Sequence, residues 1–314
     1  MLDVVTHVTH ITHVAQVVLD VVTHVAHVTH VTRVTQVVLD VGCGTGILSL
    51  FAARAGARLV IAVDASAILH QARQIVERNG YQGKVVLLQS TMEQVYLPEG
   101  IDKVDVIISE WMGYGLLYES MLPSVLFARD RFLKPGGAVL PTACPLLLTA
   151  SSHNHLAFWT DVYGFDMGNV ADAARADASI ETIPPNAALS AATLFNTIDC
   201  TSCADRDLDF TSPFEIAISR SGELRSLVVH FDTIFDLSGA GGSRTEFSTS
   251  AAAPSTHWKQ TALYLNKPRA VEAGSTLHGS ISFRRQGAYK RAYDISVVYH
   301  LDGVQCDVQM WRMQ

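Results

Sequence analysis

The distribution of hydrophobic and polar positions changes near Val37. Residues 1–36 repeat a triplet of the Thr-His-Val type, and this period matches neither the helical repeat of about 3.6 residues nor the two-residue alternation of a strand. Valine and threonine favour extended structure over helix, so the pattern predicts no packed helix here. We interpret residues 1–36 as a low-complexity repeat that does not resemble a native domain.

The repeat carries six histidines at short intervals. Imidazoles spaced in this way can converge on one zinc ion, although we favour a by-product of the repeat as their origin. These residues are His7, His10, His13, His24, His27 and His30.

From Val37 onward, short apolar runs alternate with helical stretches, as in βαβ units around a parallel sheet. We predict a helix over residues 47–55 and strands at 37–41, 59–63, 85–88, 104–109 and 138–140. After Pro141 the chain is rich in strand-like runs, whose spacing is typical of a β-barrel or sandwich. These runs are 214–218, 227–231, 277–283 and 295–299. The fold class is therefore α/β followed by an all-β region.

Composition excludes several classes of function. The 314 residues carry a net charge of −7 without a cluster of lysine and arginine, which argues against direct nucleic-acid binding. No apolar run reaches the length of about 18 residues that a membrane helix needs, so we expect no membrane partner. Five scattered cysteines favour a reduced compartment, with Cys200 and Cys203 either a redox pair or, as we favour, loop cysteines.

The first predicted strand runs directly into Asp40-Val41-Gly42-Cys43-Gly44-Thr45-Gly46. Glycines serve where the backbone turns sharply and a ligand approaches it. Ile47 replaces the third glycine of a nicotinamide-binding fingerprint, which argues against a dehydrogenase. Asp64 ends the second strand, where it either accepts the hydroxyls of a ribose or caps a helix, and Glu93 follows the third strand as an adenine contact or a loop residue.

Two carboxylates flank a loop after the fourth predicted strand. Glu110 and Glu119 enclose two glycines and three aromatic residues, so the loop can fold back and set both carboxylates at one pocket. Two like charges are costly together unless a cation lies between them. A guanidinium fits best, because its planar fork pairs with carboxylates in bidentate fashion.

The stretch from Ser109 through Glu119, which begins Ser-Glu-Trp-Met-Gly-Tyr, and the triplet Thr256-His257-Trp258 resemble the double-glutamate and Thr-His-Trp loops of type I-like protein arginine N-methyltransferases. The resemblance covers the chain from Val37 to its C-terminus. It implies a Rossmann-like S-adenosylmethionine-dependent methyltransferase domain at 37–141 and a substrate-side β-barrel domain at 142–314. It also implies methyl transfer to arginine, with monomethyl and asymmetric dimethyl arginine as products.

The resemblance implies a role for each motif residue, and the chemistry needs no metal. Glu110, Glu119 and His257 are the predicted catalytic residues. The predicted contacts of S-adenosylmethionine are Asp40, Gly42, Cys43, Gly44, Gly46, Asp64, Met92, Glu93 and Glu110. The predicted substrate contacts are Met112, Tyr114, Met121 and Trp258, although core packing explains the two methionines equally well.

An aromatic-rich insertion, from Phe158 to Met167, resembles the dimerisation arm of the family, which we place around 153–185. The resemblance therefore implies a homodimer, with core packing inside one chain as the rival explanation. It further implies arginine-containing protein substrates, with histones and RNA-binding proteins as candidates, and a location in the cytoplasm or the nucleus.

The sequence departs from the family ahead of the glycine loop. Family members carry there a helical lid with aromatic residues, an arginine for the cofactor carboxylate, and an acidic partner for the loop histidine. Here the first aromatic is Phe51, the first glutamate is Glu77, and Arg33 lies inside the repeat. Only Asp3 or Asp20 could serve as the partner of the histidine, which is otherwise structural.

We expect weak or absent turnover without that lid, because methyl transfer requires the exclusion of water. The alternative function is a catalytically impaired homologue that dimerises with, or regulates, an active relative.

Overall fold

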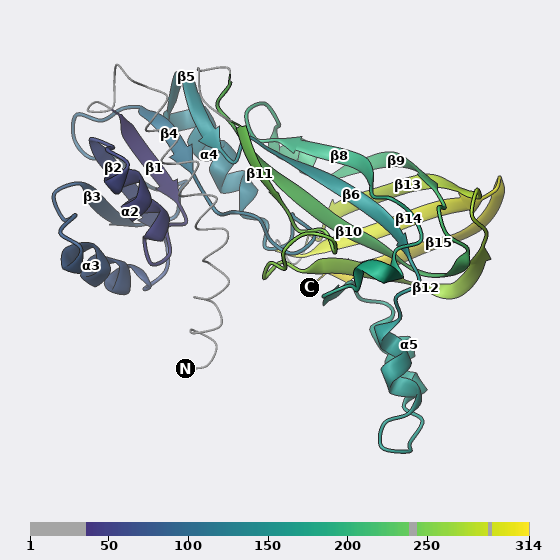
Figure 1. The fold of residues 1–314 in the computed structure, drawn as a ribbon. Helices are drawn as coiled ribbons and strands as arrows, with labels where there is room; N and C mark the ends of the chain where they lie inside the picture. The colour runs from purple at the N-terminus through teal and green to yellow at the C-terminus, as the bar shows by residue number, and fades with distance from the viewer. Residues whose placement is uncertain (1–35, 239–243, 288–290, 314) are drawn as a thin grey trace.

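The computed structural model describes residues 36–238, 244–287 and 291–313. The repeat with its six histidines, together with Asp3, Asp20 and Arg33, lies outside the described residues. Figure 1 shows two regions side by side, one built around a parallel sheet and the other around long antiparallel strands. In the described part of the chain, each helix is too short or too polar to cross a membrane.

The first region contains a five-stranded parallel sheet in the order β3-β2-β1-β4-β5. Its strands are β1 (Val37–Val41), β2 (Leu59–Asp64), β3 (Val85–Gln89), β4 (Val104–Ile108) and β5 (Leu133–Leu140). Every residue of β1 is buried, as expected for a strand covered on both faces. Chain order reverses between β1 and β4, and ligands of such sheets bind at the carboxyl ends beside this point.

The strands predicted in this region are confirmed to within one residue at each end, except for the start of β5. β5 begins at Leu133, five residues before the predicted start at 138. Its register against β4 shifts between Val104 and Val106, so the Pro135-Gly136-Gly137 stretch is accommodated in an irregular segment of the strand. The sequence pattern identified only the regular part.

Three helices connect the parallel strands: α2 (Ile47–Arg54), α3 (Leu69–Arg78) and α4 (Leu122–Phe132). The predicted helix at 47–55 is α2, which ends one residue early. In α3 the buried residues Leu69, Ala72 and Val76 recur at the three- and four-residue spacing of one helical face.

The second region contains two antiparallel sheets. The order in one is β7-β12-β10-β6-β8, with β11 paired to β10, and in the other it is β15-β14-β13-β9. Their strands are β6 (Ala143–Ser151), β7 (Ser179–Glu181), β8 (Thr193–Asp199), β9 (Phe210–Ala217), β10 (Gly222–Asp236), β11 (Arg244–Ser248), β12 (Gln260–Val271), β13 (Thr276–Arg285), β14 (Tyr293–Leu301) and β15 (Val304–Met313). The four runs predicted as strands correspond to β9, β10, β13 and β14, and only the first of them, 214–218, extends one residue past its strand. The predicted fold class is confirmed.

A helical segment projects away from the antiparallel region (Figure 1). It consists of the 3-10 helix η1 (His155–Thr160) and α5 (Gly168–Ala174), and we call residues 155–174 the arm. Phe158, Tyr163 and Phe165 are 56%, 98% and 71% exposed. Core packing therefore does not explain these three aromatic residues.

Two short 3-10 helices, η2 (Pro185–Ala187) and η3 (Asp205–Leu208), connect further strands. Cys200 and Cys203 are free cysteines in the turn between β8 and η3. A hydrogen bond with Cys144, followed by burial, raises the pKa of Cys200, and burial raises the pKa of Cys203, so the neutral thiol is favoured over the reactive thiolate in both. For Cys203 the pKa is about 11.

Candidate functional site

The glycine-rich loop between β1 and α2 turns sharply because three of its glycines have left-handed backbone angles. The angle φ is +71° at Gly42, +54° at Gly44 and +86° at Gly46, a region that residues with a Cβ rarely adopt. The N–H groups of Gly42 and Cys43 donate to the carbonyl oxygen of Val63, at 2.9 and 3.0 Å. These bonds tie the loop to the carboxyl end of β2.

Asp64, the last residue of β2, joins the two loops at this sheet edge. Its Oδ2 accepts a hydrogen bond from the Gly44 N–H at 3.0 Å. Its Oδ1 accepts from the N–H and the hydroxyl of Ser66, at 2.8 and 2.6 Å. A carboxylate offers about four acceptor positions, so these three donors leave room for a ligand hydroxyl.

A cavity of about 290 Å³ opens beside these loops. Glu93 lies in its wall and accepts a hydrogen bond from the Ser124 hydroxyl at 2.6 Å. A Cβ on Gly42 would lie 2.1 Å from Met121 Cε, so that flexible side chain would have to shift, and the φ of +71° further favours glycine at this position. The cavity is lined by Val41, Gly42, Val63, Asp64, Ala65, Ser90, Thr91, Met92, Glu93, Met121 and Ser124.

Two predicted cofactor contacts lie behind the glycine loop. Asp40 is fully buried, and its Oδ2 accepts a hydrogen bond from the Ser49 hydroxyl at 2.5 Å. Burial raises the pKa of Asp40 to about 7. Burial also raises the pKa of the Cys43 thiol. Neither side chain is part of the cavity lining, so both hold the loop in place, and their contact with a cofactor stays a prediction.

A second cavity, of about 190 Å³, adjoins the first. Met121 lines both cavities and therefore forms their shared wall. The second cavity is lined by Glu110, Trp111, Met112, Gly113, Tyr114, Glu119, Met121, His257 and Trp258. The structure thus brings the predicted substrate and catalytic residues together.

The loop between the two glutamates folds back on itself. Gly113 donates to the Leu116 carbonyl at 2.9 Å, and the Leu116 N–H donates to the Gly113 carbonyl at 3.0 Å. Leu116 and Glu119 have φ angles of +73° and +76°, in the left-handed region that is costly for residues with a Cβ. Such strain clusters at functional sites, and here it accompanies the bend that brings Glu119 back towards Glu110.

The two carboxylates influence each other electrostatically. Desolvation by the surrounding pocket, followed by repulsion from Glu119, raises the pKa of Glu110 to about 7, although 45% of its side chain is exposed. Glu119 is half exposed and pairs with Arg291, whose Nη2 lies 3.2 Å from Glu119 Oε1. The Glu119 N–H also donates to the Arg291 carbonyl at 2.9 Å. A cation at this cavity therefore finds one carboxylate that already binds a guanidinium and a second that it would help to ionise.

The Thr-His-Trp triplet closes the cavity from the antiparallel region. His257 Nε2 lies 3.9 Å from Glu110 Oε1, so the histidine has an acidic neighbour within the described residues. Trp258 is 2% exposed and donates its indole N–H to the Met112 carbonyl at 2.8 Å. Because that N–H is used inside the protein, Trp258 holds the loop, and its direct contact with a substrate stays a prediction.

The remaining predicted substrate contacts differ in exposure. Met112 is 6% exposed and packs in the hydrophobic core, and it also lines the cavity, so its contact with a substrate stays a prediction. Tyr114 is 36% exposed, and its ring stacks on Tyr118 with a centroid distance of 6.3 Å. Its phenol is therefore accessible from solvent.

Sequence reasoning missed two residues of the site. Ser124 fixes Glu93 from the first turn of α4, and Arg291 reaches Glu119 from the segment before β14. The hydroxyl of Ser124, which follows the double-glutamate loop at the same sheet edge, could have marked it as a site residue. No sequence pattern could have identified Arg291, because 172 positions separate it from Glu119.

The first cavity can hold a nucleoside, with Asp64 as acceptor for ribose hydroxyls and Glu93 as acceptor for an amino group. The second can hold a planar cation between Glu110 and Glu119. Their shared wall at Met121 places the two ligands next to each other.

Comparisons with known proteins cover both regions of the chain. A family model described as "Methyltransferase domain" matches residues 38–137, and one described as "Arginine methyltransferase oligomerization subdomain" matches residues 146–304. The chain is 40% identical over 278 residues to "Probable protein arginine N-methyltransferase 1.2" of Arabidopsis thaliana, covering 87% of this chain and 75% of that protein. It is 38% identical over 287 residues to "Protein arginine N-methyltransferase 1" of Chlamydomonas reinhardtii, covering 89% and 82%.

Solved structures with the same fold include "Trypanosoma brucei PRMT1 enzyme-prozyme heterotetrameric complex with AdoHcy". The similarity has a TM-score of 0.88 at 33% identity and covers 98% of each chain. Protein Arginine Methyltransferase 10 of Arabidopsis thaliana matches with a TM-score of 0.83 at 26% identity, covering 95% of this chain and 94% of that one. The similarity thus spans the parallel and the antiparallel regions together.

Proposed function

Because the chain belongs to the protein arginine N-methyltransferase family, we propose that it transfers a methyl group from S-adenosylmethionine to a guanidinium nitrogen of arginine in protein substrates. The observation that carries the proposal is the pair of adjoining cavities with Met121 as their shared wall. One cavity has the acceptors that a nucleoside needs, and the other has paired carboxylates. Direct transfer requires the methyl donor and the acceptor to lie in contact.

The residues of the first cavity fit S-adenosylmethionine. Asp64 would hold the ribose hydroxyls and Glu93 the adenine amino group, while the glycine loop offers a backbone surface that a Cβ at Gly42 would obstruct. When bound, S-adenosylmethionine supplies a methyl group on a positively charged sulfur. Asp40 and Ser49 would keep the loop in its conformation from behind.

The residues of the second cavity would hold and orient the substrate guanidinium. Glu119 already accepts a guanidinium in the structure, from Arg291, which a substrate arginine would displace or join. Glu110 on the other side would complete a bidentate clamp. Two carboxylates draw positive charge away from the attacking nitrogen, so its electron pair becomes available for the methyl group.

Glu110 is also placed to take the proton that leaves the guanidinium. The pKa of this carboxyl is about 7, which is high enough for a proton acceptor at neutral pH. His257 lies 3.9 Å from its Oε1 and would pass the proton onward or stabilise the ionised carboxylate. Glu110, Glu119 and His257 are the catalytic residues in this proposal.

We further propose a homodimer formed through the arm, arginine-containing substrates such as histones or RNA-binding proteins, and a cytoplasmic or nuclear location. The exposed aromatic residues Phe158, Tyr163 and Phe165 support the dimer, because exposed apolar patches mark interfaces. The change from parallel to antiparallel pairing between β5 and β6 supports domains at 37–141 and 142–314, after the repeat at 1–36.

The proposal is tested with the full chain, labelled S-adenosylmethionine and two peptides that differ only by arginine or lysine at the central position. We expect label in the arginine peptide alone, with monomethyl and asymmetric dimethyl arginine after hydrolysis. The rate is expected to be low, because residues 1–36 lack the aromatic residues of the family's lid. Binding of S-adenosylmethionine without transfer to arginine would overturn the proposal in favour of an impaired regulatory homologue.

A further inference from the structure

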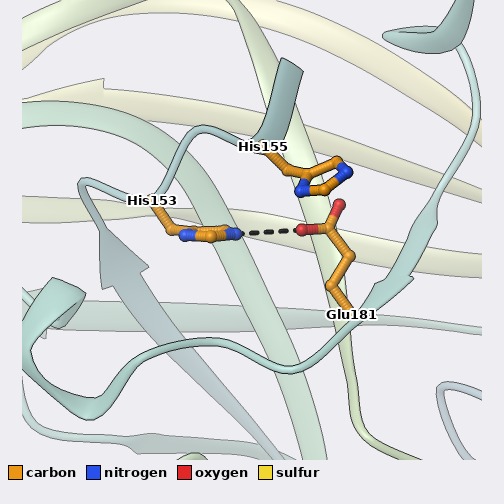
Figure 2. A group of neighbouring side chains, drawn as sticks. All are labelled: His153, His155 and Glu181. Carbon is orange, nitrogen blue, oxygen red and sulfur yellow. Dashed lines mark hydrogen bonds and ion pairs between the residues drawn. The ribbon is translucent and has the colours of Figure 1, made fainter. Parts of the chain in front are cut away.

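Three potential metal ligands meet at the base of the arm, outside both cavities. His153 and His155 lie where the chain enters the arm, and Glu181 lies in β7 where the chain leaves it. One ligand atom of each lies within 4.8 Å of the others. Figure 2 shows both imidazoles next to the Glu181 carboxylate, with a dashed line from the His153 ring to one of its oxygens.

Hydrogen bonds fix the carboxylate of this group. Tyr264 donates its hydroxyl to Glu181, at 3.0 Å from Oε1 and 2.9 Å from Oε2, and the Ser179 hydroxyl donates to Oε1 at 2.5 Å. The Tyr264 oxygen also accepts the backbone N–H of His155 at 3.0 Å. One buried tyrosine of β12 therefore positions the segments that carry two of the three ligands.

We propose that His153, His155 and Glu181 form a binding site for a divalent transition metal of the zinc class. Two imidazoles and one carboxylate are ligands that zinc accepts in tetrahedral sites, with the fourth position left for water. Magnesium and calcium prefer oxygen ligands throughout, so the two histidines select against them. His155 is exposed, so the fourth position faces solvent.

The distances are compatible with an ion. His153 Nε2 lies 2.9 Å from Glu181 Oε2, which without a metal is an ion pair or hydrogen bond. Ligand atoms around tetrahedral zinc lie about 3.4 Å apart, so this pair must open by roughly half an ångström. Hydrogen bonds hold the Glu181 carboxylate, so this movement falls to His153, whose side chain is the more exposed of the two at 18% against 10%.

The surroundings match those of metal ligands in other proteins. Carboxylate ligands are themselves hydrogen-bonded by outer partners, and Ser179 and Tyr264 fill that role here. An ion pair alone would explain His153 and Glu181, but it assigns no role to the imidazole of His155.

A metal at this position would join the two ends of the arm. His153 and His155 precede most of the arm and Glu181 follows it, so the ion closes the segment into a loop and reduces its freedom. The site does not depend on methyl transfer, because none of its three ligands lines either cavity.

The test is a Co²⁺ titration of the metal-free full chain, followed by the visible absorption of tetrahedral Co²⁺, with Zn²⁺ stoichiometry from equilibrium dialysis. His155→Ala removes an exposed ligand and leaves the His153–Glu181 contact, so the fold is preserved. His70→Ala, at an exposed histidine of α3, is the matched control. The histidines of the repeat are the same in all three proteins, so only differences between them count.

We expect His155→Ala to bind one ion fewer per chain and to lose the absorption of this site, while His70→Ala equals the unaltered chain. Tyr264→Phe should keep the site but weaken its affinity for Zn²⁺ about tenfold to a hundredfold. Equal stoichiometry and equal spectra for His155→Ala and the unaltered chain would overturn the proposal and leave an ion pair at this position.

Discussion

The two cavities that meet at Met121 are built in different ways. In the first, the carboxylates of Asp64 and Glu93 accept hydrogen bonds from N–H and hydroxyl groups of the same region. In the second, Glu110 and Glu119 come from the parallel region, but the basic side chains beside them, His257 and Arg291, come from the antiparallel region.

This difference suits the first cavity to binding a neutral nucleoside and the second to binding a positively charged substrate. Neutral donors at fixed positions suit a neutral ribose and adenine, because the carboxylates keep their hydrogen bonds before and after binding. Like charges with displaceable cations suit a positively charged guest, because its arrival relieves the repulsion between them. We therefore expect substitutions in the second cavity to affect catalysis and those in the first to affect cofactor affinity.

The largest effect is expected for Glu110→Gln, which keeps the shape of the side chain and removes its charge. The variant loses half of the proposed guanidinium clamp and the proton acceptor, so kcat/KM for an arginine peptide should fall about 10²- to 10³-fold. Steady-state kinetics measure this loss. Calorimetric titration tests the predicted contact of Glu110 with S-adenosylmethionine, and because Glu110 lines the second cavity and not the first, we expect the affinity to change little. A variant that retains its rate would contradict the role of Glu110.

The next largest effect is expected for Asp64→Ala, which should weaken the binding of S-adenosylmethionine in the first cavity. The variant loses the acceptor for ribose hydroxyls and the bond to the Gly44 N–H, so affinity for S-adenosylmethionine should fall about tenfold to a hundredfold. Calorimetric titration measures it, with Asp102→Ala, at an exposed aspartate, as the matched control. Equal dissociation constants for the two variants would remove Asp64 from the cofactor site.

The first cavity was largely predictable from sequence, and the second only in part. Asp64 ends one parallel strand and Glu93 follows the next. The carboxyl ends of such strands meet at one edge of the sheet, so the local strand pattern alone predicts that the two side chains lie close together. Glu110 follows β4 by the same rule. The partners of the glutamates, His257 and Arg291, depend on how the antiparallel region packs against this edge, which no local pattern encodes.

A motif also does not say which side chains of a loop face its ligand. Asp40 and Cys43 belong to the glycine motif, yet their side chains are buried behind the loop. The cluster of His153, His155 and Glu181 has no motif at all, because Glu181 and the histidine segment come together across β12, whose Tyr264 hydrogen-bonds both. Long-range pairing of this kind is the information that the sequence pattern lacks.

A smaller decrease in kcat/KM is expected when the pH is lowered by one unit below 7. Glu110 must be ionised to hold the guanidinium, and its pKa of about 7 predicts that kcat/KM rises with pH and then levels off. Below the pKa the decline should be about tenfold per pH unit for this one group. A pH profile for the unaltered chain measures it.

The raised pKa of Glu110 also makes the stability of the fold depend on pH, and stability changes with pH in the opposite direction to kcat/KM. The folded protein holds the Glu110 proton between pH 4.5 and about 7, where the unfolded chain has released it, so the contribution of Glu110 to stability decreases as the pH rises through this window. Glu110→Gln should remove this contribution as well as the step in the rate profile. A step near pH 7 that persists in the variant would assign it to a group other than Glu110.

The smallest effect on activity is expected for Trp258→Phe, which separates holding the loop from contacting the substrate. The ring can still pack on Phe247, but the bond from the indole N–H to the Met112 carbonyl is lost, so the free energy of unfolding should fall by about 1–3 kcal/mol. Trp311→Phe is the matched control, because Trp311 is also buried and donates to the carbonyl of Tyr264 at 3.0 Å. Urea denaturation should give similar losses for both variants, while KM for the arginine peptide should rise, by less than tenfold, in Trp258→Phe alone. If KM changes in neither variant, Trp258 stabilises the fold without positioning the loop that carries the two glutamates.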